Sequence, residues 1–261
     1  MNQTFDFQRF LLMTRLEIAE KGRNQLLMAG VMVGALLLMM LPIMFSTEYR
    51  TSLSELHSLA LLLLVLFGGS LYTIQVFVQY DTTNSTIAAL MVPASRLEKF
   101  LSTLVLNLAF IVPFVLLAWG LHFWTIDYAN NHLLSGEDKY ERLPGSVINT
   151  VITLTMVIQS VVFFGAMYFT KAAYIKTAAT FIVIAGLGAA ANNYMAQSMM
   201  PSSTYFSATP FSSWRIRLND AGPFYNVDLP ESMQLFVSGL PIIIMLALWY
   251  ITYVRLVEKE V

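Results

Sequence analysis

The sequence predicts an all-α integral membrane protein with six transmembrane helices, an amphipathic helix ahead of them and a folded outer segment between the fifth and sixth. Six long apolar runs contain no Asp, Glu, Lys or Arg, and each approaches the roughly 20 residues that a helix needs to cross a bilayer. Hydrophobic residues make up 57% of the chain and charged residues 12%, against roughly 45–50% and 25% in soluble proteins. The predicted spans are 26–45, 58–80, 100–124, 147–169, 177–194 and 234–254.

The distribution of Lys and Arg between the loops predicts the orientation. With both termini in the cytoplasm, the cytoplasmic segments hold ten of the fifteen cations, and the other face holds Arg50, Lys139, Arg142, Arg215 and Arg217. Cytoplasmic loops of membrane proteins are enriched in these residues. We therefore expect a multi-pass protein of the plasma (inner) membrane with both termini in the cytoplasm. The first apolar run follows a mixed-charge segment without a small-residue cleavage site, so it is expected to be retained as a span.

Residues 1–25 are predicted to form a cytoplasmic amphipathic helix before the six-span domain of residues 26–261. At 100° per residue, Phe7, Leu11 and Leu12 fall on a broad apolar arc, and Asp6 and Arg9 fall on the opposite arc. This pattern is typical of a helix in the plane of the lipid headgroups. Packing against the cytoplasmic surface of the protein itself would give the same pattern, and the sequence leaves both alternatives open.

The cytoplasmic loop 81–99 contains the signals of a short helix, a proline corner and a charged entry into the third span. Asn84 or Ser85 can cap a helix that ends near Val92. Ser95 is followed three residues later by Glu98, the spacing of a capping box, which places the start of the third span here. Pro93 predicts a break before that start.

The segment 195–233 is the longest stretch outside the predicted spans. It is rich in aromatic residues and prolines, whereas disordered linkers are poor in aromatics. A folded cap or a re-entrant piece is therefore expected between spans five and six. Span five itself contains Gly186, Gly188 and several alanines, which favour close approach to another helix.

The polar groups inside the spans are uncharged, which argues against a self-powered, ion-coupled pump. Their expected role is either hydrogen bonding between helices or a weakly polar lining for an amphipathic substrate. The residues assigned to this pathway lining are Tyr72, Gln75, Gln79, Asn107, Asn149, Thr153 and Gln159.

Several kinds of chemistry have no motif in the sequence. No Lys follows a Gly, so the chain lacks a nucleotide-binding P-loop. His57, His122 and His132 lack ligand-like spacing and are interpreted as ordinary interfacial residues. With no Cys in the chain, disulfides and thiolate sites are excluded. Neither a catalytic residue nor a metal site is predicted, and neither is a cofactor in this chain or a nucleic-acid partner.

The layout resembles the permease subunit of ATP-binding-cassette (ABC) exporters of the ABC-2 type. The resemblance rests on the amphipathic approach helix, the six spans with both ends inside, the bulky segment between spans five and six, and the run Leu90-Met91-Val92-Pro93-Ala94-Ser95-Arg96-Leu97-Glu98-Lys99. It implies that the loop docks on a separate cytoplasmic ATPase subunit, which binds ATP and Mg, and that two permease chains pair. The coupling residues implied in this way are Asn84, Ser85, Pro93, Ser95, Arg96, Glu98 and Lys99.

The expected function is that of a non-enzymatic transmembrane subunit of an ATP-driven exporter for an apolar or amphipathic substrate. Two alternatives come from other classes. The chain could be a structural membrane anchor of an envelope complex, because coupling segments and docking anchors look alike in sequence. An intramembrane lipid-modifying enzyme is the third hypothesis, but such an enzyme needs a buried acid, base, nucleophile or metal set.

Overall fold

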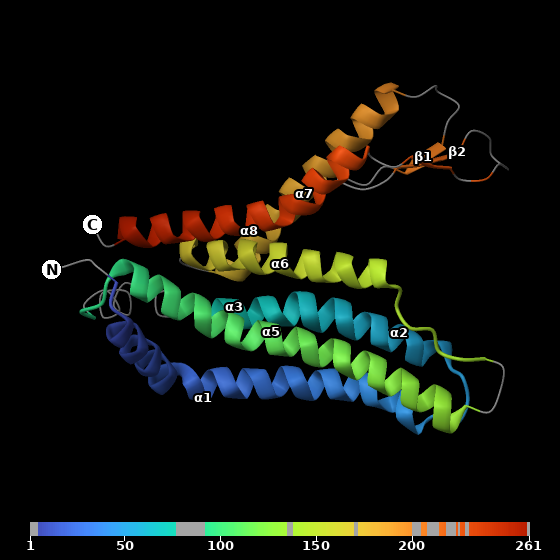
Figure 1. Ribbon diagram of the computed structural model, residues 1–261, viewed down its shortest axis with the longest axis horizontal. Coiled ribbons are helices and arrows are strands. Elements are labelled where there is room, and N and C mark those ends of the chain that lie inside the picture. Colours follow the sequence, from blue (N-terminus) through green and yellow to red (C-terminus); the bar gives the residue numbers. More distant parts are fainter. Residues whose placement is uncertain are drawn as a thin grey trace.

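The computed structural model describes residues 5–76, 92–134, 138–169, 172–199, 205–207, 214–217, 223, 225–227 and 230–259. These residues form a bundle of long helices with a small antiparallel sheet at one end (Figure 1). Helix α1 begins and helix α8 ends at the same end of the bundle, which we call the terminal end (Figure 1). The helical elements are α1 (Phe7–Met40), the 3-10 helix η1 (Leu41–Phe45), α2 (Thr51–Ala60), the π-helix η2 (Leu61–Gly68), α3 (Gly69–Val76), α5 (Arg96–Tyr128), the π-helical turn η4 (Ala129–Leu133), α6 (Gly145–Tyr168), α7 (Ala173–Met199) and α8 (Glu231–Lys259).

Among the residues that the structure describes, five helical segments are long and apolar enough to cross a membrane. They are Phe7–Phe45, Arg96–Leu133, Val147–Tyr168, Ala173–Met199 and Glu231–Glu258. Each coincides with one of the predicted spans, and all except Val147–Tyr168 extend beyond the predicted bounds at one end or at both. The chain is therefore a largely helical, multi-pass membrane protein, as the apolar runs predict.

The second predicted span has a different form. Residues 51–76 are helical without interruption, but they comprise α2, the π-helix η2 and α3, and none of these pieces alone is long enough to cross a bilayer. The last residues of the predicted run, 77–80, lie outside the described residues. A sixth crossing therefore stays a prediction.

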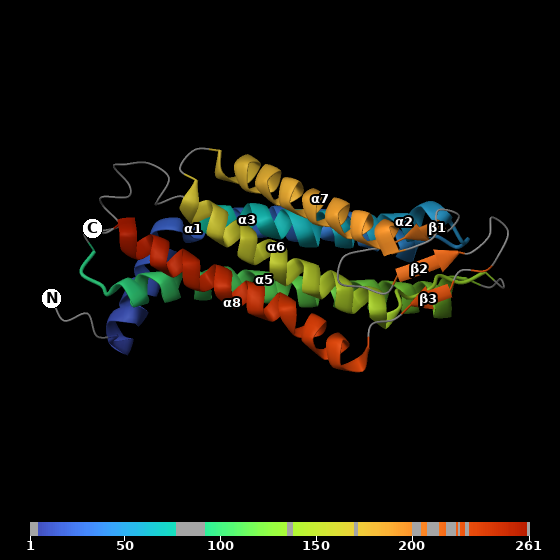
Figure 2. The ribbon, with the colours of Figure 1, turned by 90° about the horizontal axis from the view of Figure 1, so that it is seen from above.

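Helix α1 is continuous across the predicted boundary between the amphipathic helix and the first span. Asp6 caps it, because its carboxylate accepts the N–H groups of Gln8 (2.8 Å) and Arg9 (3.3 Å). Figures 1 and 2 show that the first part of α1 is bent relative to the remainder. In this first part the apolar arc is exposed, with Phe7 at 64% and Leu12 at 63%. The apolar arc therefore does not pack on the described residues of the protein.

The core lies between α1, the α2–η2–α3 segment and α5. Leu36 and Met40 of α1, Val65 of η2, and Phe114 and Trp119 of α5 are buried in one cluster. A second cluster joins α5, α6 and the last turns of α8 through Phe100, Phe163 and Leu256. Apolar side chains at the surface of a membrane protein meet lipid tails without a hydrophobic penalty, so burial is confined to helix contacts.

Helices α7 and α8 are the least buried. Ile182 and Leu187 of α7 and Leu235 of α8 are 68%, 66% and 80% exposed. At the end opposite the terminal end, the two helices lean away from the rest of the bundle (Figure 1). Gly186 and Gly188 have open space around the position where a Cβ would lie, so the described residues of this chain do not pack against the small-residue face of α7.

The segment between α7 and α8 contains β1 (Tyr205–Ser207), β2 (Trp214–Arg217) and β3 (Tyr225–Val227). They form an antiparallel sheet in the order β1-β2-β3, with Phe206 opposite Ile216 and Arg215 opposite Asn226. Folded structure in this segment was expected, but its β-structure was not. Among the described residues, this sheet departs from the predicted all-α architecture.

Candidate functional site

The start of α5 is held by the predicted capping box. The Glu98 backbone N–H donates to Ser95 Oγ (3.3 Å), and the Ser95 backbone N–H donates to Glu98 Oε2 (2.7 Å). These reciprocal bonds satisfy two of the amides that a helix start leaves without partners. The predicted capping box is therefore present at the start of α5, and Pro93 precedes it as an exposed residue.

The same carboxylate also binds the first turn of α1. Glu98 Oε1 accepts the backbone N–H of Asp6 (2.7 Å) and the guanidinium Nη2 of Arg9 (3.1 Å), while the Glu98 side chain is fully buried. A buried carboxylate is stabilised when its oxygens accept several donors and face a cation. We call the group formed by Asp6, Arg9, Ser95 and Glu98 the Glu98 junction. One side chain in it joins the beginnings of two helices.

A second buried carboxylate continues this contact two turns along α1. Glu17 is 1% exposed and accepts hydrogen bonds from Ser102 Oγ (2.9 Å) and Thr103 Oγ1 (3.4 Å) of α5. Farther along α1, Lys21 Nζ donates to the carbonyl of Val76 at the end of α3 (3.2 Å). The polar face of the predicted amphipathic helix is therefore the face that contacts α5 and α3.

The structure places the predicted coupling residues in different environments. Arg96 is partly exposed and lines a groove of about 230 Å³ between α5 and α8, together with Leu97 and Tyr253. Lys99 is 2% exposed and Ser95 is 8% exposed. Asn84 and Ser85 lie outside the described residues.

Among the residues predicted to line a pathway, Asn107 and Gln159 meet inside the bundle, with Thr73 between them. Thr73 Oγ1 donates to Asn107 Oδ1 (3.0 Å). The Gln159 amide is satisfied when its nitrogen donates to Thr73 Oγ1 (2.6 Å) and to the Gly69 carbonyl (3.3 Å), and its oxygen accepts the Ser70 N–H (3.1 Å). Gln159 thus binds the Gly69 carbonyl and the Ser70 N–H at the start of α3, directly after the π-helix η2.

The other predicted lining residues lie elsewhere. Tyr72 is 5% exposed and stacks on Phe110 with ring centroids 3.9 Å apart. Gln75 and Asn149 are exposed, and Thr153 is partly buried. Gln79 lies outside the described residues. Of the six predicted lining residues that the structure describes, it thus brings two together.

A buried histidine pair is a further polar contact that the sequence does not predict. His57 of α2 and His122 of α5 are each 2% exposed, and their Nδ1 atoms are 3.4 Å apart. His57 Nε2 lies 3.0 Å from the Met40 carbonyl, so it donates, and His122 Nε2 accepts the Leu143 N–H at 3.4 Å. The Nε2 atom of His57 therefore carries a proton, and the Nε2 atom of His122 does not. His122 Nδ1–H then donates to the unprotonated Nδ1 of His57, and both rings are neutral. The pair ties α1, α2, α5 and the chain before α6 together.

Within the part of the chain that the structure describes, no group of three or more His, Asp or Glu residues is arranged to hold a metal ion. The polar groups inside the bundle are therefore interpreted through their hydrogen bonds. No family model, curated protein or solved structure matches this chain. Its function has to be inferred from the geometry above.

Proposed function

We propose that this chain is the membrane-spanning permease subunit of an ATP-driven exporter of the ABC-2 type. In this proposal it crosses the inner membrane six times, with both termini in the cytoplasm, and pairs with a second permease chain. A separate cytoplasmic ATPase binds ATP and Mg and supplies the energy. The substrate is apolar or amphipathic, because the spans offer no opposite charge to replace the hydration of an ion.

The observation that carries the proposal is the Glu98 junction. A loop that transmits force must be connected stiffly to the helices that it moves. At the start of α5, three donors from two helices converge on one buried carboxylate, and Glu17 extends the contact along α1. Displacement of residues 92–99 would therefore move the beginnings of α1 and α5 as one unit.

The exposed apolar arc of α1 supports the same proposal. Phe7 and Leu12 point away from the protein, while the polar face of this part of α1 contacts α5. A helix with this arrangement at the terminal end can rest its apolar arc in the lipid interface. A force on the loop would then be transmitted along the membrane surface.

Contact with the ATPase is assigned to Arg96 and to the loop residues before it. Arg96 is partly exposed at the terminal end, whereas Lys99 is buried and serves the packing of α5. A charge on the rim of an interface mainly affects association with the partner. Arg96 is therefore the residue whose charge is reversed in the test.

The test measures whether a co-purified ATPase binds this chain and whether its nucleotide hydrolysis responds to it. Arg96→Glu is expected to weaken association. Lys139→Glu, the same charge change at the opposite end of the bundle, is expected to leave it unchanged. Two glycines inserted after Pro93 should preserve association but abolish the response of hydrolysis, because the loop would no longer be stiffly joined to α5. If both loop variants behave like the unmodified chain, the coupling assignment is wrong and the structural-anchor hypothesis takes its place.

A further inference from the structure

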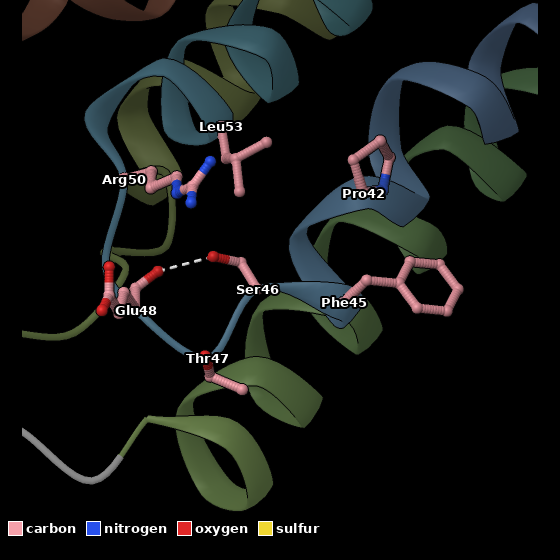
Figure 3. Close-up of a pocket in the computed structure, with 7 residues that line it drawn as sticks. All are labelled: Pro42, Phe45, Ser46, Thr47, Glu48, Arg50 and Leu53. Carbon is pink, nitrogen blue, oxygen red and sulfur yellow. Dashed lines mark hydrogen bonds between the residues drawn. The ribbon is translucent and has the colours of Figure 1, made fainter.

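A pocket opens at the end of the bundle opposite the terminal end, where α1 gives way to α2. It has a volume of about 400 Å³, within the range of small-molecule sites. Pro42 and Phe45 of η1 line one side of the pocket, and Arg50 and Leu53 at the start of α2 line the other side (Figure 3). The connecting loop, residues 46–50, closes the pocket between them.

The loop that forms this pocket is held in place by hydrogen bonds to residues from other parts of the chain. Tyr140 is 3% exposed, and its hydroxyl accepts the Arg50 backbone N–H (3.0 Å) and donates to the Glu48 carbonyl (3.4 Å). Ser46 Oγ donates to the same carbonyl (2.7 Å). Asn130 of η4 in turn binds both backbone groups of Tyr140 at 2.9 Å. Because these bonds fix the backbone, the pocket exists before any ligand arrives.

The pocket is lined by one cationic residue, Arg50, and one anionic residue, Glu48. Figure 3 shows the Arg50 side chain extending into the space between η1 and α2, whereas the carboxyl group of Glu48 lies on the other side of the loop. Arg50 is exposed, and α2 starts beside it without a side chain bonded to its first amides. A guanidinium matches the oxygens of a phosphate with two parallel hydrogen bonds.

The position of the pocket corresponds to the level of the lipid headgroups. It lies where the first apolar run ends, and Phe45 projects outward there with 83% of its surface exposed. Exposed aromatic residues of the kind that gather at membrane interfaces occur near the same end, namely Tyr49, Trp124 and Tyr128. A ligand bound to Arg50 could therefore keep its apolar part in the membrane, beside Pro42 and Phe45.

We propose that this pocket binds the phosphate group of a membrane phospholipid. Arg50 binds the phosphate, and Pro42, Phe45 and Leu53 contact the apolar part of the lipid. The proposal goes beyond the exporter function and does not rest on it. Free inorganic phosphate presents the same anionic group. The apolar surface favours the phospholipid, and the experiment separates the two sources.

The experiment uses the purified full chain in a neutral detergent and counts bound lipid by native mass spectrometry during titration. The probes are phosphatidic acid, diacylglycerol with the same acyl chains, and inorganic phosphate. Phosphatidic acid should bind saturably and at least about tenfold more tightly than diacylglycerol, a difference of about 1.4 kcal/mol. Arg50→Gln should remove that preference, and Arg50→Lys should retain part of it.

Lys139→Gln is the matched control, since it removes an exposed cation at the same end that does not line the pocket. It should bind phosphatidic acid like the unmodified chain.

Unchanged thermal unfolding of the Arg50 variants would show that they fold. Equal binding by Arg50→Gln and the unmodified chain would overturn the site. Displacement of phosphatidic acid by inorganic phosphate at a similar concentration would overturn the assignment to a phospholipid. In each case the ATPase experiment would be unaffected.

Discussion

Glu98 joins the starts of α1 and α5 at the terminal end. Its two oxygens accept three donors, from Asp6, Arg9 and Ser95. The sequence identifies one of these contacts, because the capping box has a fixed local spacing. The bonds to Asp6 and Arg9 join positions 92 and 89 residues apart, and no local pattern indicates such a pair.

Replacing Glu98 with Gln tests the junction. A Gln side chain has one acceptor oxygen, so its NH2 group must face either the Ser95 amide or the donors of α1, and a buried donor then loses its partner. We expect the free energy of unfolding to fall by about 1–3 kcal/mol, measured by thermal unfolding in detergent. Arg9→Gln is the control, because Arg9 is 38% exposed and its loss leaves the backbone donors bonded. A loss from Arg9→Gln as large as that from Glu98→Gln would contradict this account.

Ala172, just before α7, adopts a backbone conformation that its side chain disfavours. Its φ angle is 53°, in the left-handed region, which costs a residue with a Cβ roughly 1–2 kcal/mol. Ala172→Gly should raise the unfolding temperature because glycine adopts this conformation freely. Ala172→Val should lower it, since a β-branched residue is less tolerated there. Equal unfolding temperatures for the two variants would show that this backbone conformation does not matter.

At the scale of the elements, apolar runs predict where the long helices lie, because length and hydropathy alone decide whether a helix can cross a membrane. They do not reveal how a helix is wound. The π-helix η2 lies in the apolar run Leu61–Gly68, and Gln159 of α6 binds Gly69 and Ser70 directly after it. The short strands β1 to β3 were also missed, since each has three or four residues, too few for a clear alternating pattern.

The contact between α6 and α7 depends on a glycine. A Cβ added at Gly165 would lie 2.7 Å from the Thr177 Cβ and closer still to its hydroxyl, so the two helices would have to separate. Gly165→Ala should therefore destabilise the protein by about 1–3 kcal/mol, the cost of overpacking, as measured by thermal unfolding. Gly188→Ala is the matched control in α7, because nothing lies within 4 Å of its Cβ position. Gly188→Ala should leave stability unchanged or raise it, because Ala has the higher helix propensity. A loss from Gly165→Ala no larger than that from Gly188→Ala would contradict this account.

At the scale of the whole molecule, the sequence predicts a polytopic helical bundle and the helices confirm it. Which polar groups meet inside the bundle depends on helix rotation, which composition does not encode. His57 and His122 were therefore interpreted as separate interfacial residues although they contact each other. For the same reason, Asn107 and Gln159 were named without their shared partner Thr73.

The orientation of the bundle can be tested directly, because the chain has no native cysteine. Thr47, Pro93, Lys139 and Glu258 are exposed and can be replaced singly by Cys. In intact cells, a membrane-impermeant maleimide should label the variants at positions 47 and 139, which the cation distribution places outside. The variants at 93 and 258 should react only after the membrane is permeabilised. The opposite labelling pattern would reverse the orientation.

The Glu98 junction also has a consequence for biosynthesis. Asp6 leaves the ribosome 92 residues before Glu98, so α1 is made well before the carboxylate that fixes its first turn. During that interval the first turn of α1 lacks its partner. The Glu98 junction can form only after α5 has entered the membrane. A chain without the first ten residues would still contain every apolar run. Its Glu98 carboxylate, however, would lack the two donors from Asp6 and Arg9. Quality-control proteases should therefore degrade such a shortened chain after its insertion is complete.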